Sequence, residues 1–256
     1  GRPVRTFVVW THPFAPLSTP LIHRDISESA VRTMLETLPQ FPGAPRLALF
    51  PLLAEEGPVA QLFLSLLKRK GRDIHRFDPY RRAALIPGKA GAGLSVSARR
   101  QGELRRQHRR LSELGNLKRQ TATAPDDVRA ALADYLELEA KGWKGQAGSA
   151  ARLDPATAAF MNAAVHALAA ERKARIDCLR LDGRAIAATI TLFSGDRAWG
   201  WKTAYDESFA RFSPGMQLAF DLSQGLGEDE HLSLVDSCAA PGGGIVDHMW
   251  PGRMAM

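Results

Sequence analysis

The chain has 256 residues, of which 45% are hydrophobic and 24% charged, so it is long enough to bury a sizeable core in one large domain or two smaller ones. No apolar run approaches the roughly 20 residues that a membrane-spanning helix needs, and we expect no transmembrane segment. We recognise no signal peptide, and Cys178 and Cys238 match no metal-binding spacing. These features predict a cytoplasmic protein with reduced thiols and no bound metal.

The net charge of +7 is concentrated in one short segment. Between Arg99 and Arg119, eight Lys and Arg residues face only two Glu residues, which gives this segment a net charge of +6. One interpretation is the solvated basic face of a connecting helix. The other is a patch for phosphate-bearing partners such as CoA, RNA or lipid headgroups. No aromatic residue interleaves the arginines, which disfavours binding of single-stranded nucleic acid.

The first half of the chain alternates segments with strand and helix patterns. Strands are predicted at Phe7–Trp10, Leu47–Phe50 and Asp73–Phe77, and helices at Ser27–Leu38 and Pro58–Lys70. The glycines of Pro87–Gly93 match neither a Walker nor a Rossmann pattern, so this segment is predicted to be a loop. The basic helix follows over Ser97–Leu114, and Gly115 is a natural helix end.

The second half predicts a strand at Leu117–Thr123, a helix from Asp126 or Asp127 to Ala140, a loop at Gly142–Ser149 and a helix from Asp154 to Arg172. Three strands follow at Arg175–Leu181, Arg184–Phe193 and Ala198–Ala204, then a helix from Ser213 and a strand at His231–Val235. The dipeptide Asp182-Gly183 between two β-rich segments predicts a hairpin. Because helices and antiparallel strands are segregated, the sequence predicts an α+β fold, with helices packed on a sheet.

Arg211, Ser213, Pro214 and Gly215 open the helix that follows the Trp-rich strand. A helix N-terminus carries unpaired N–H groups and a partial positive charge. Here Ser213 can cap it, Pro214 suits the first helical position, Gly215 leaves room for a ligand and Arg211 can fork onto an anion. The segment is therefore a candidate phosphate site, and the alternative is a well-formed helix start that binds nothing.

Three segments together resemble the CelD-type acetyltransferase-like domain of the GNAT superfamily, a group associated with cellulose biosynthesis. They are "LELEAKGWKGQAGSA" at 136–150, "WGWKTAYDESFARFSPGMQL" at 199–218 and "VDSCAAPGGGIVDHMWPGRM" at 235–254. The basic segment ending in "LRRQHRRLSELGNL" is similar to the segment before this domain. The chain is also similar to the Fem-type peptidoglycan aminoacyltransferases. The resemblance extends from about residue 94 to the C-terminus.

The resemblance implies a GNAT-like mixed, mostly antiparallel sheet flanked by helices, with two such units in tandem. The expected division is a degenerate N-terminal half at 1–94, a basic connecting helix at 95–120 and a C-terminal acetyltransferase-like domain at 121–256. It also implies acetyl-CoA or another acyl-CoA as co-substrate, with its pyrophosphate at Arg211–Gly215. The usual phosphate loop of the superfamily, Q/R-x-x-G-x-G/A, is matched only by Arg211 and Gly215.

Direct attack on a thioester needs a base, oxyanion donors and an acid. The catalytic candidates are Tyr205, Asp206, Asp236 and His248, and each has a structural alternative. Asp206 and Asp236 can shape turns, Tyr205 can belong to the core, and His248 can be a hydrogen-bonded structural histidine.

The acceptor-binding candidates are Trp143, Lys144, Trp201 and Lys202. Trp143 can stack on an acceptor and Lys144 can bind it by charge, although Trp143 can equally fill the core beneath a loop.

Three functions compete at this stage. The first is transfer of an acyl group from acyl-CoA to an amine or hydroxyl of a small-molecule, saccharide or envelope-precursor acceptor. The second is a Fem-like transferase that uses aminoacyl-tRNA, which the basic helix favours. The third is a non-catalytic scaffold in polysaccharide or envelope assembly that keeps the fold.

Overall fold

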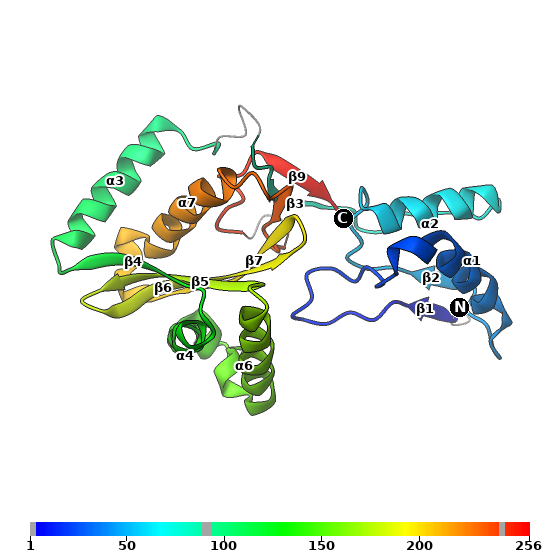
Figure 1. The fold of residues 1–256 in the computed structure, drawn as a ribbon, viewed down its shortest axis with the longest axis horizontal. Helices are drawn as coiled ribbons and strands as arrows, with labels where there is room; N and C mark the ends of the chain where they lie inside the picture. Colours follow the sequence, from blue (N-terminus) through cyan, green and yellow to red (C-terminus); the bar gives the residue numbers. More distant parts are fainter. Residues whose placement is uncertain (1–3, 89–93, 241–243) are drawn as a thin grey trace. The chain divides into compact units, whose positions relative to one another are not determined.

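The computed structural model describes residues 4–88, 94–240 and 244–256 (Figure 1). Its strands are β1 (Thr6–Val8), β2 (Leu47–Leu49), β3 (Arg81–Leu85), β4 (Leu117–Ala122), β5 (Ala174–Leu181), β6 (Arg184–Ser194), β7 (Arg197–Tyr205), β8 (Leu234–Asp236) and β9 (Gly252–Ala255). Its α-helices are α1 (Ser27–Thr37), α2 (Pro58–Arg69), α3 (Ala98–Ser112), α4 (Pro125–Lys141), α5 (Trp143–Gln146), α6 (Pro155–Ala170) and α7 (Pro214–Gly227). Short 3-10 helices are η1 (Arg24–Ile26), η2 (Leu38–Gln40), η3 (Ala151–Leu153) and η4 (Glu207–Phe212).

The chain forms two compact units, residues 1–81 with 254–256 and residues 82–253. In the first unit β1 and β2 form a parallel pair, and α1 and α2 share a small core built on Val31, Phe63 and Leu66. The expected boundaries at residues 94 and 120 both fall inside the second unit. The division into a degenerate half, a connecting helix and a C-terminal domain stays a prediction.

The second unit is built on a mixed sheet with the strand order β4-β5-β6-β7-β8-β3-β9. The strands β4 to β7 are antiparallel, β7 and β8 are parallel, and β8 and β3 are antiparallel. Helices α3 and α7 lie on one face, and α4 and α6 lie on the other (Figure 1). This arrangement confirms the predicted α+β class with a mostly antiparallel sheet flanked by helices.

The Asp182-Gly183 hairpin is confirmed, because both residues have the positive φ angles, 50° and 81°, that a type I′ turn requires. The helices predicted from apolar periodicity are also confirmed, with ends shifted by a few residues. Asp154 caps α6 by accepting hydrogen bonds from the main chain of Ala156 and Thr157, as its position before Pro155 predicts.

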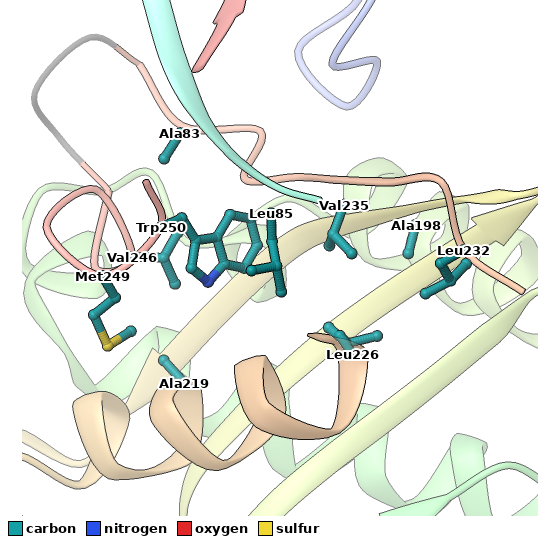
Figure 2. Close-up of a cluster of buried hydrophobic side chains, with 10 residues drawn as sticks. All are labelled: Ala83, Leu85, Ala198, Ala219, Leu226, Leu232, Val235, Val246, Met249 and Trp250. Atoms are coloured by element: carbon teal, nitrogen blue, oxygen red, sulfur yellow. The ribbon is translucent and has the colours of Figure 1, made fainter. Parts of the chain in front are cut away.

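A buried apolar cluster fills the space between α7 and the strands β3, β7 and β8 (Figure 2). Ala219 and Leu226 come from α7, Leu85 comes from β3, and Trp250 is inserted from the C-terminal segment. The Trp250 ring is 4% exposed, and its N–H donates to the Ser223 hydroxyl at 2.8 Å, which satisfies the one polar group of the indole. The cluster fixes α7 against the end of the sheet where β8 lies.

Three element predictions were wrong. Residues 73–77 are exposed and form no strand, whereas β3 lies at Arg81–Leu85, where two arginines and two alanines give little apolar signal. Residues 142–149 contain the short helix α5 and are not only a loop. The last predicted strand begins later, at Leu234. Most of the predicted loop at 87–93, and residues 241–243 of the third motif, lie outside the described residues.

Candidate active site

Strands β7 and β8 run side by side for only three residues. The parallel register joins Arg197–Trp199 to Leu234–Asp236, and β7 then continues alone on this side to Tyr205. Gly200 stands where the strands part: a Cβ there would lie 3.8 Å from the main-chain oxygen of Asp236 and 3.9 Å from that of Ser237. The separation leaves an edge of β7 to which an extended ligand can add as a strand does.

A β-bulge interrupts β7 at the same place. On β6, Thr191 pairs with Gly200 and Ile190 pairs with Lys202, so the register skips Trp201. A bulge reverses the side-chain alternation that follows it. Strict alternation along the strand would place Trp199, Trp201 and Thr203 on one face, and the bulge breaks that grouping. After the bulge, Lys202 lies on the face that carries α4 and Tyr205 lies on the face that carries α7.

The start of α7 lies just beyond the end of β7. Ser213 occupies the N-cap position in a left-handed conformation (φ 51°), and its hydroxyl makes no capping hydrogen bond, which corrects the expected cap. That hydroxyl accepts instead from the Gln107 side chain at 3.3 Å, and the same amide donates to the Arg211 carbonyl at 3.2 Å. Arg211 is exposed and stacks on Phe212, with 4.6 Å from Cζ to the ring centroid.

Pro214 and Gly215 are buried at the first turn of α7. A Cβ on Gly215 would lie 3.2 Å from Cδ1 of Tyr205 and 3.3 Å from Cδ1 of Ile245. The glycine thus permits close packing, and its Cα face is not the open approach that the sequence suggested. The first-turn N–H groups and the Arg211 guanidinium remain the candidate anion-binding groups of this segment.

Asp206 has a structural part in this arrangement. Its Oδ1 accepts from the Ser208 main chain at 3.0 Å and from the Ser208 hydroxyl at 2.6 Å, while Oδ2 is paired with Arg184. This is the turn-capping alternative recognised in the sequence. Neighbouring Glu207 binds the main-chain N–H of Trp143 at 2.7 Å, so the turn after β7 also fixes the start of α5.

A buried carboxylate lies on the opposite face of β7. Glu139 of α4 is 6% exposed and accepts hydrogen bonds from Nζ of Lys144 at 2.6 Å, from the Tyr135 hydroxyl at 2.9 Å and from the Ala151 main chain at 2.9 Å. Burial alone would raise the pKa of Glu139, but the bonds from Lys144 and Ala151 outweigh it and lower the pKa. Burial raises the pKa of Tyr135, and the Glu139 charge adds to that rise.

Lys202 lies close enough to this cluster to be affected by its charges. Burial lowers the pKa of Lys202, and the positive charge of Lys144 lowers it further, whereas Glu139 acts in the opposite sense. Its Nζ is 5.9 Å from the Trp201 ring centroid, and Trp201 is buried at 9% exposure. Trp143 is 61% exposed, so it does not fill the core beneath the loop.

A second charged cluster lies at the end of β8. Arg82 of β3 and Asp236 are both at most 3% exposed and form an ion pair, and Asp236 also accepts from the Cys238 main chain at 2.9 Å. Burial raises the pKa of Asp236, and Arg82 opposes that rise. Burial and the Asp236 charge raise the pKa of the Cys238 thiol, which keeps it protonated. Burial likewise raises the pKa of Cys178 to about 11.

The candidates therefore form three groups. Tyr205 packs against Gly215 at the start of α7, Lys202 interacts with Lys144 beside Trp143, and Asp236 is paired at the point where β7 and β8 separate. His248 is exposed in the turn at residues 245–249, before β9. Within the described ranges, no group of three His, Cys, Asp or Glu residues is arranged to hold a metal ion.

Sequence reasoning missed Glu139, Tyr135, Gln107 and Arg82. Glu139 follows Tyr135 by one helical turn and precedes Lys144 by five residues, and this spacing is a usable signal. Gln107 and Arg82 act across 104 and 154 residues of sequence, so no local pattern identifies them.

A family model described as "Acetyltransferase (GNAT) domain" matches residues 97–241, which is more than half of the chain. The chain belongs to the GNAT acetyltransferase family. The match places this protein among the GNAT-fold transferases, and it covers α3, the sheet from β4 to β8, and α7.

Two solved structures share the fold of this GNAT protein. FemX is 12% identical, with 91% of this chain and 74% of FemX covered and a TM-score of 0.57. A conserved protein of unknown function from Bacteroides thetaiotaomicron VPI-5482 is 12% identical, with coverages of 89% and 73% and a TM-score of 0.53. At these identities the likeness is one of fold alone. No curated protein shows a significant sequence match. Across the described part of the chain, every helix is too short or too polar to span a membrane.

Proposed function

We propose that this GNAT protein moves an acyl group, preferably acetyl, from acyl-CoA to an amine or hydroxyl acceptor. The observation that carries the proposal is the separation of β7 from β8 after Trp199, with the start of α7 at the far end of β7. The amide groups of the CoA arm can hydrogen-bond along the open edge of β7. The pyrophosphate then meets the first-turn N–H groups of α7 and the exposed Arg211.

The proposed reaction is a direct transfer. The acceptor lone pair attacks the thioester carbonyl carbon, a new C–N or C–O bond forms, and the C–S bond breaks. The acceptor loses its proton to a base, and the CoA thiolate takes a proton from an acid. The oxygens of Asp206 and Asp236 are held by Ser208, Arg184 and Arg82, so we retain Tyr205 and His248 as the proton-transfer candidates.

We place the acceptor beside Trp143, Lys144, Trp201 and Lys202. An exposed indole next to a lysine suits stacking on a sugar ring or another flat group, and Lys144 lies 5.9 Å from the Trp143 ring centroid. Together with the CelD-type motifs, this supports a saccharide or envelope-precursor acceptor, and with it a part in polysaccharide or envelope biosynthesis.

Isothermal titration with CoA tests donor binding. We expect heat of binding for the wild type and an affinity loss of roughly tenfold or more in Arg211→Ala, because a charge-assisted phosphate contact is removed. The control is Arg129→Ala, which removes an exposed arginine from α4 on the other face of the sheet. No heat with wild type, or equal losses in both variants, would contradict the proposal.

The arginines of α3 support a second candidate, a transferase that takes its acyl group from aminoacyl-tRNA. Among the described residues, Arg99, Arg105, Arg106 and Arg110 are exposed and have no acidic partner within salt-bridge distance. Such a row suits a phosphodiester backbone. Filter binding of tRNA at rising salt decides between the two candidates, since a steep salt dependence that Arg106→Gln reduces is expected only for the second.

A further inference from the structure

Glu139 has a position that neither donor nor acceptor binding explains. It is a buried carboxylate on α4, and its three hydrogen bonds come from α4 itself, from α5 and from η3. A buried charge is tolerated only when it is paired and hydrogen-bonded. Two of the partners, Lys144 and Ala151, lie near the two ends of the 142–153 segment, so one carboxylate fastens the segment at its beginning and its end.

The segment that Glu139 fastens carries two of the acceptor candidates. Lys144 is bound to it directly, and Trp143 is the preceding residue. The Ala151 contact holds the other end, where η3 begins. Without these contacts, a short helix of four residues between glycines has little intrinsic stability.

Lys202 faces the same cluster from β7. The groups that act on its charge are Lys144 from α5, Glu139 from α4 and the Cys238 thiol from the segment after β8. Burial raises the pKa of that thiol, which leaves it neutral. Besides burial, the pKa of Lys202 is therefore affected by the positive charge of Lys144 and the negative charge of Glu139, and Glu139 also holds Lys144 in place.

We propose that Glu139 is a positioning residue for the acyl transfer: it touches neither substrate, and it fixes Lys144 and the 142–153 segment beside Lys202. This inference rests on the proposed function, because it assumes that Lys144 and Lys202 bind the acceptor. Its physical content is that the hydrogen bonds of Glu139 hold Lys144 and the 142–153 segment in place for acceptor binding. The Glu139 charge in addition opposes the effects of burial and of Lys144 on the pKa of Lys202.

The test compares Glu139→Gln with Tyr135→Phe. Both variants keep nearly the shape of the side chain and weaken the hydrogen bonds of the same buried site. Only Glu139→Gln removes the negative charge, whereas Tyr135→Phe removes the hydroxyl that donates to Glu139. Loss of the negative charge lowers the pKa of Lys202 further, because Lys144 then acts on it unopposed. The first readout is the titration of the Lys202 amine in isotope-labelled protein by NMR, with its signal identified by its absence in Lys202→Arg.

The second readout is steady-state kinetics with acetyl-CoA and an amine acceptor. For Glu139→Gln we expect kcat/KM for the acceptor to fall by about tenfold or more, since misplaced binding groups reduce rate strongly, with CoA affinity unchanged. A third variant, Glu139→Asp, keeps the charge but shortens the side chain. It should return the Lys202 titration toward that of the wild type while acceptor kcat/KM stays low.

A folded Glu139→Gln protein whose Lys202 titrates as in the wild type would overturn the inference, as would an equal shift in Tyr135→Phe. Equal losses of CoA and acceptor binding would also overturn it, because they indicate a general structural role. If the wild type transfers no acyl group from acetyl-CoA, the proposed function fails. The Lys202 titration, which needs no activity, still decides whether Glu139 controls Lys202.

Discussion

Two charged clusters of the second unit, one at the end of β8 and one beside β7, are built differently. At the end of β8, Arg82 and Asp236 are both almost fully buried, and their charges cancel. Beside β7, Glu139 is buried and bound by Lys144, and both Lys144 and Lys202 keep partial exposure. The first cluster is sealed from solvent, whereas the lysines of the second remain partly exposed.

The difference between the two clusters separates a part that stabilises the fold from a part that a substrate can reach. Breaking a buried ion pair costs much free energy. Such a pair does not attract a charged ligand, because each charge is already compensated by the other. A partly exposed cluster that contains two lysines can interact with an anionic or electron-rich group of a substrate. The comparison indicates that Asp236 holds β3 against β8 through Arg82, and it favours the proposal that the acceptor binds beside Lys144 and Lys202.

The largest effect is expected at the sealed cluster. Asp236→Asn leaves Arg82 buried without its counter-charge, and we expect the free energy of unfolding to fall by about 3–5 kcal/mol. Urea denaturation measures it. The control is Asp134→Asn, which breaks the partly exposed pair with Arg180 and should cost less than about 1 kcal/mol. Similar losses in the two variants would show that the sealed cluster is not sealed.

An intermediate effect is expected at the cluster beside β7. Lys144→Met removes the cationic partner of Glu139 but leaves the bonds from Tyr135 and Ala151, so we expect a loss of about 1–3 kcal/mol. Lys141→Met is the matched control on the same helix end, because it removes an exposed pair with Glu137 that is worth about 0.5 kcal/mol. Thermal unfolding of both variants measures the two losses of stability. A greater loss in Lys141→Met than in Lys144→Met would contradict the prediction.

The smallest effect on the free energy of unfolding is expected at Lys202, where the substitution should stabilise the protein and not destabilise it. Because the folded state lowers the pKa of Lys202, the unfolded chain binds more protons between the folded pKa and the unfolded one, and stability rises with pH across that window. Below the window the charged amine destabilises the folded state. Lys202→Met should therefore be more stable than the wild type at pH 7. The difference in the free energy of unfolding should be less than about 1 kcal/mol, because Lys202 is partly solvated, and it should be smaller at pH 10. A variant less stable at pH 7 would contradict this.

Much of the second unit could be predicted from sequence because its signals are local. Apolar periodicity predicts α3, α4, α6 and α7, and the Asp182-Gly183 turn predicts the β5–β6 hairpin. By contrast, β3 is a strand because β8 pairs with it, and neither its arginines nor its alanines favour one.

The candidate site was predictable only in part. Lys144, Lys202 and Arg211 are recognisable as unusual residues in motif segments, and the structure places Lys144 and Lys202 close enough to interact. The bulge at Trp201 decides which face each side chain occupies, and no composition rule indicates it. Glu139 has a local signal in its spacing from Tyr135 and Lys144, whereas Gln107 contacts the start of α7 across more than 100 residues of sequence, which a single sequence does not reveal.

The bulge has a kinetic consequence. Since β7 turns Tyr205 toward α7 and Lys202 toward α4, the proposed donor and acceptor would approach one strand from opposite sides. Both substrates could then be bound at the same time, before any product is released. The acyl group would pass directly to the acceptor, and no acyl-enzyme intermediate is needed. The lines of double-reciprocal plots at several fixed acceptor concentrations should accordingly intersect. Parallel lines would instead indicate that the acyl group is first transferred to a residue of the protein, as a covalent acyl-enzyme intermediate.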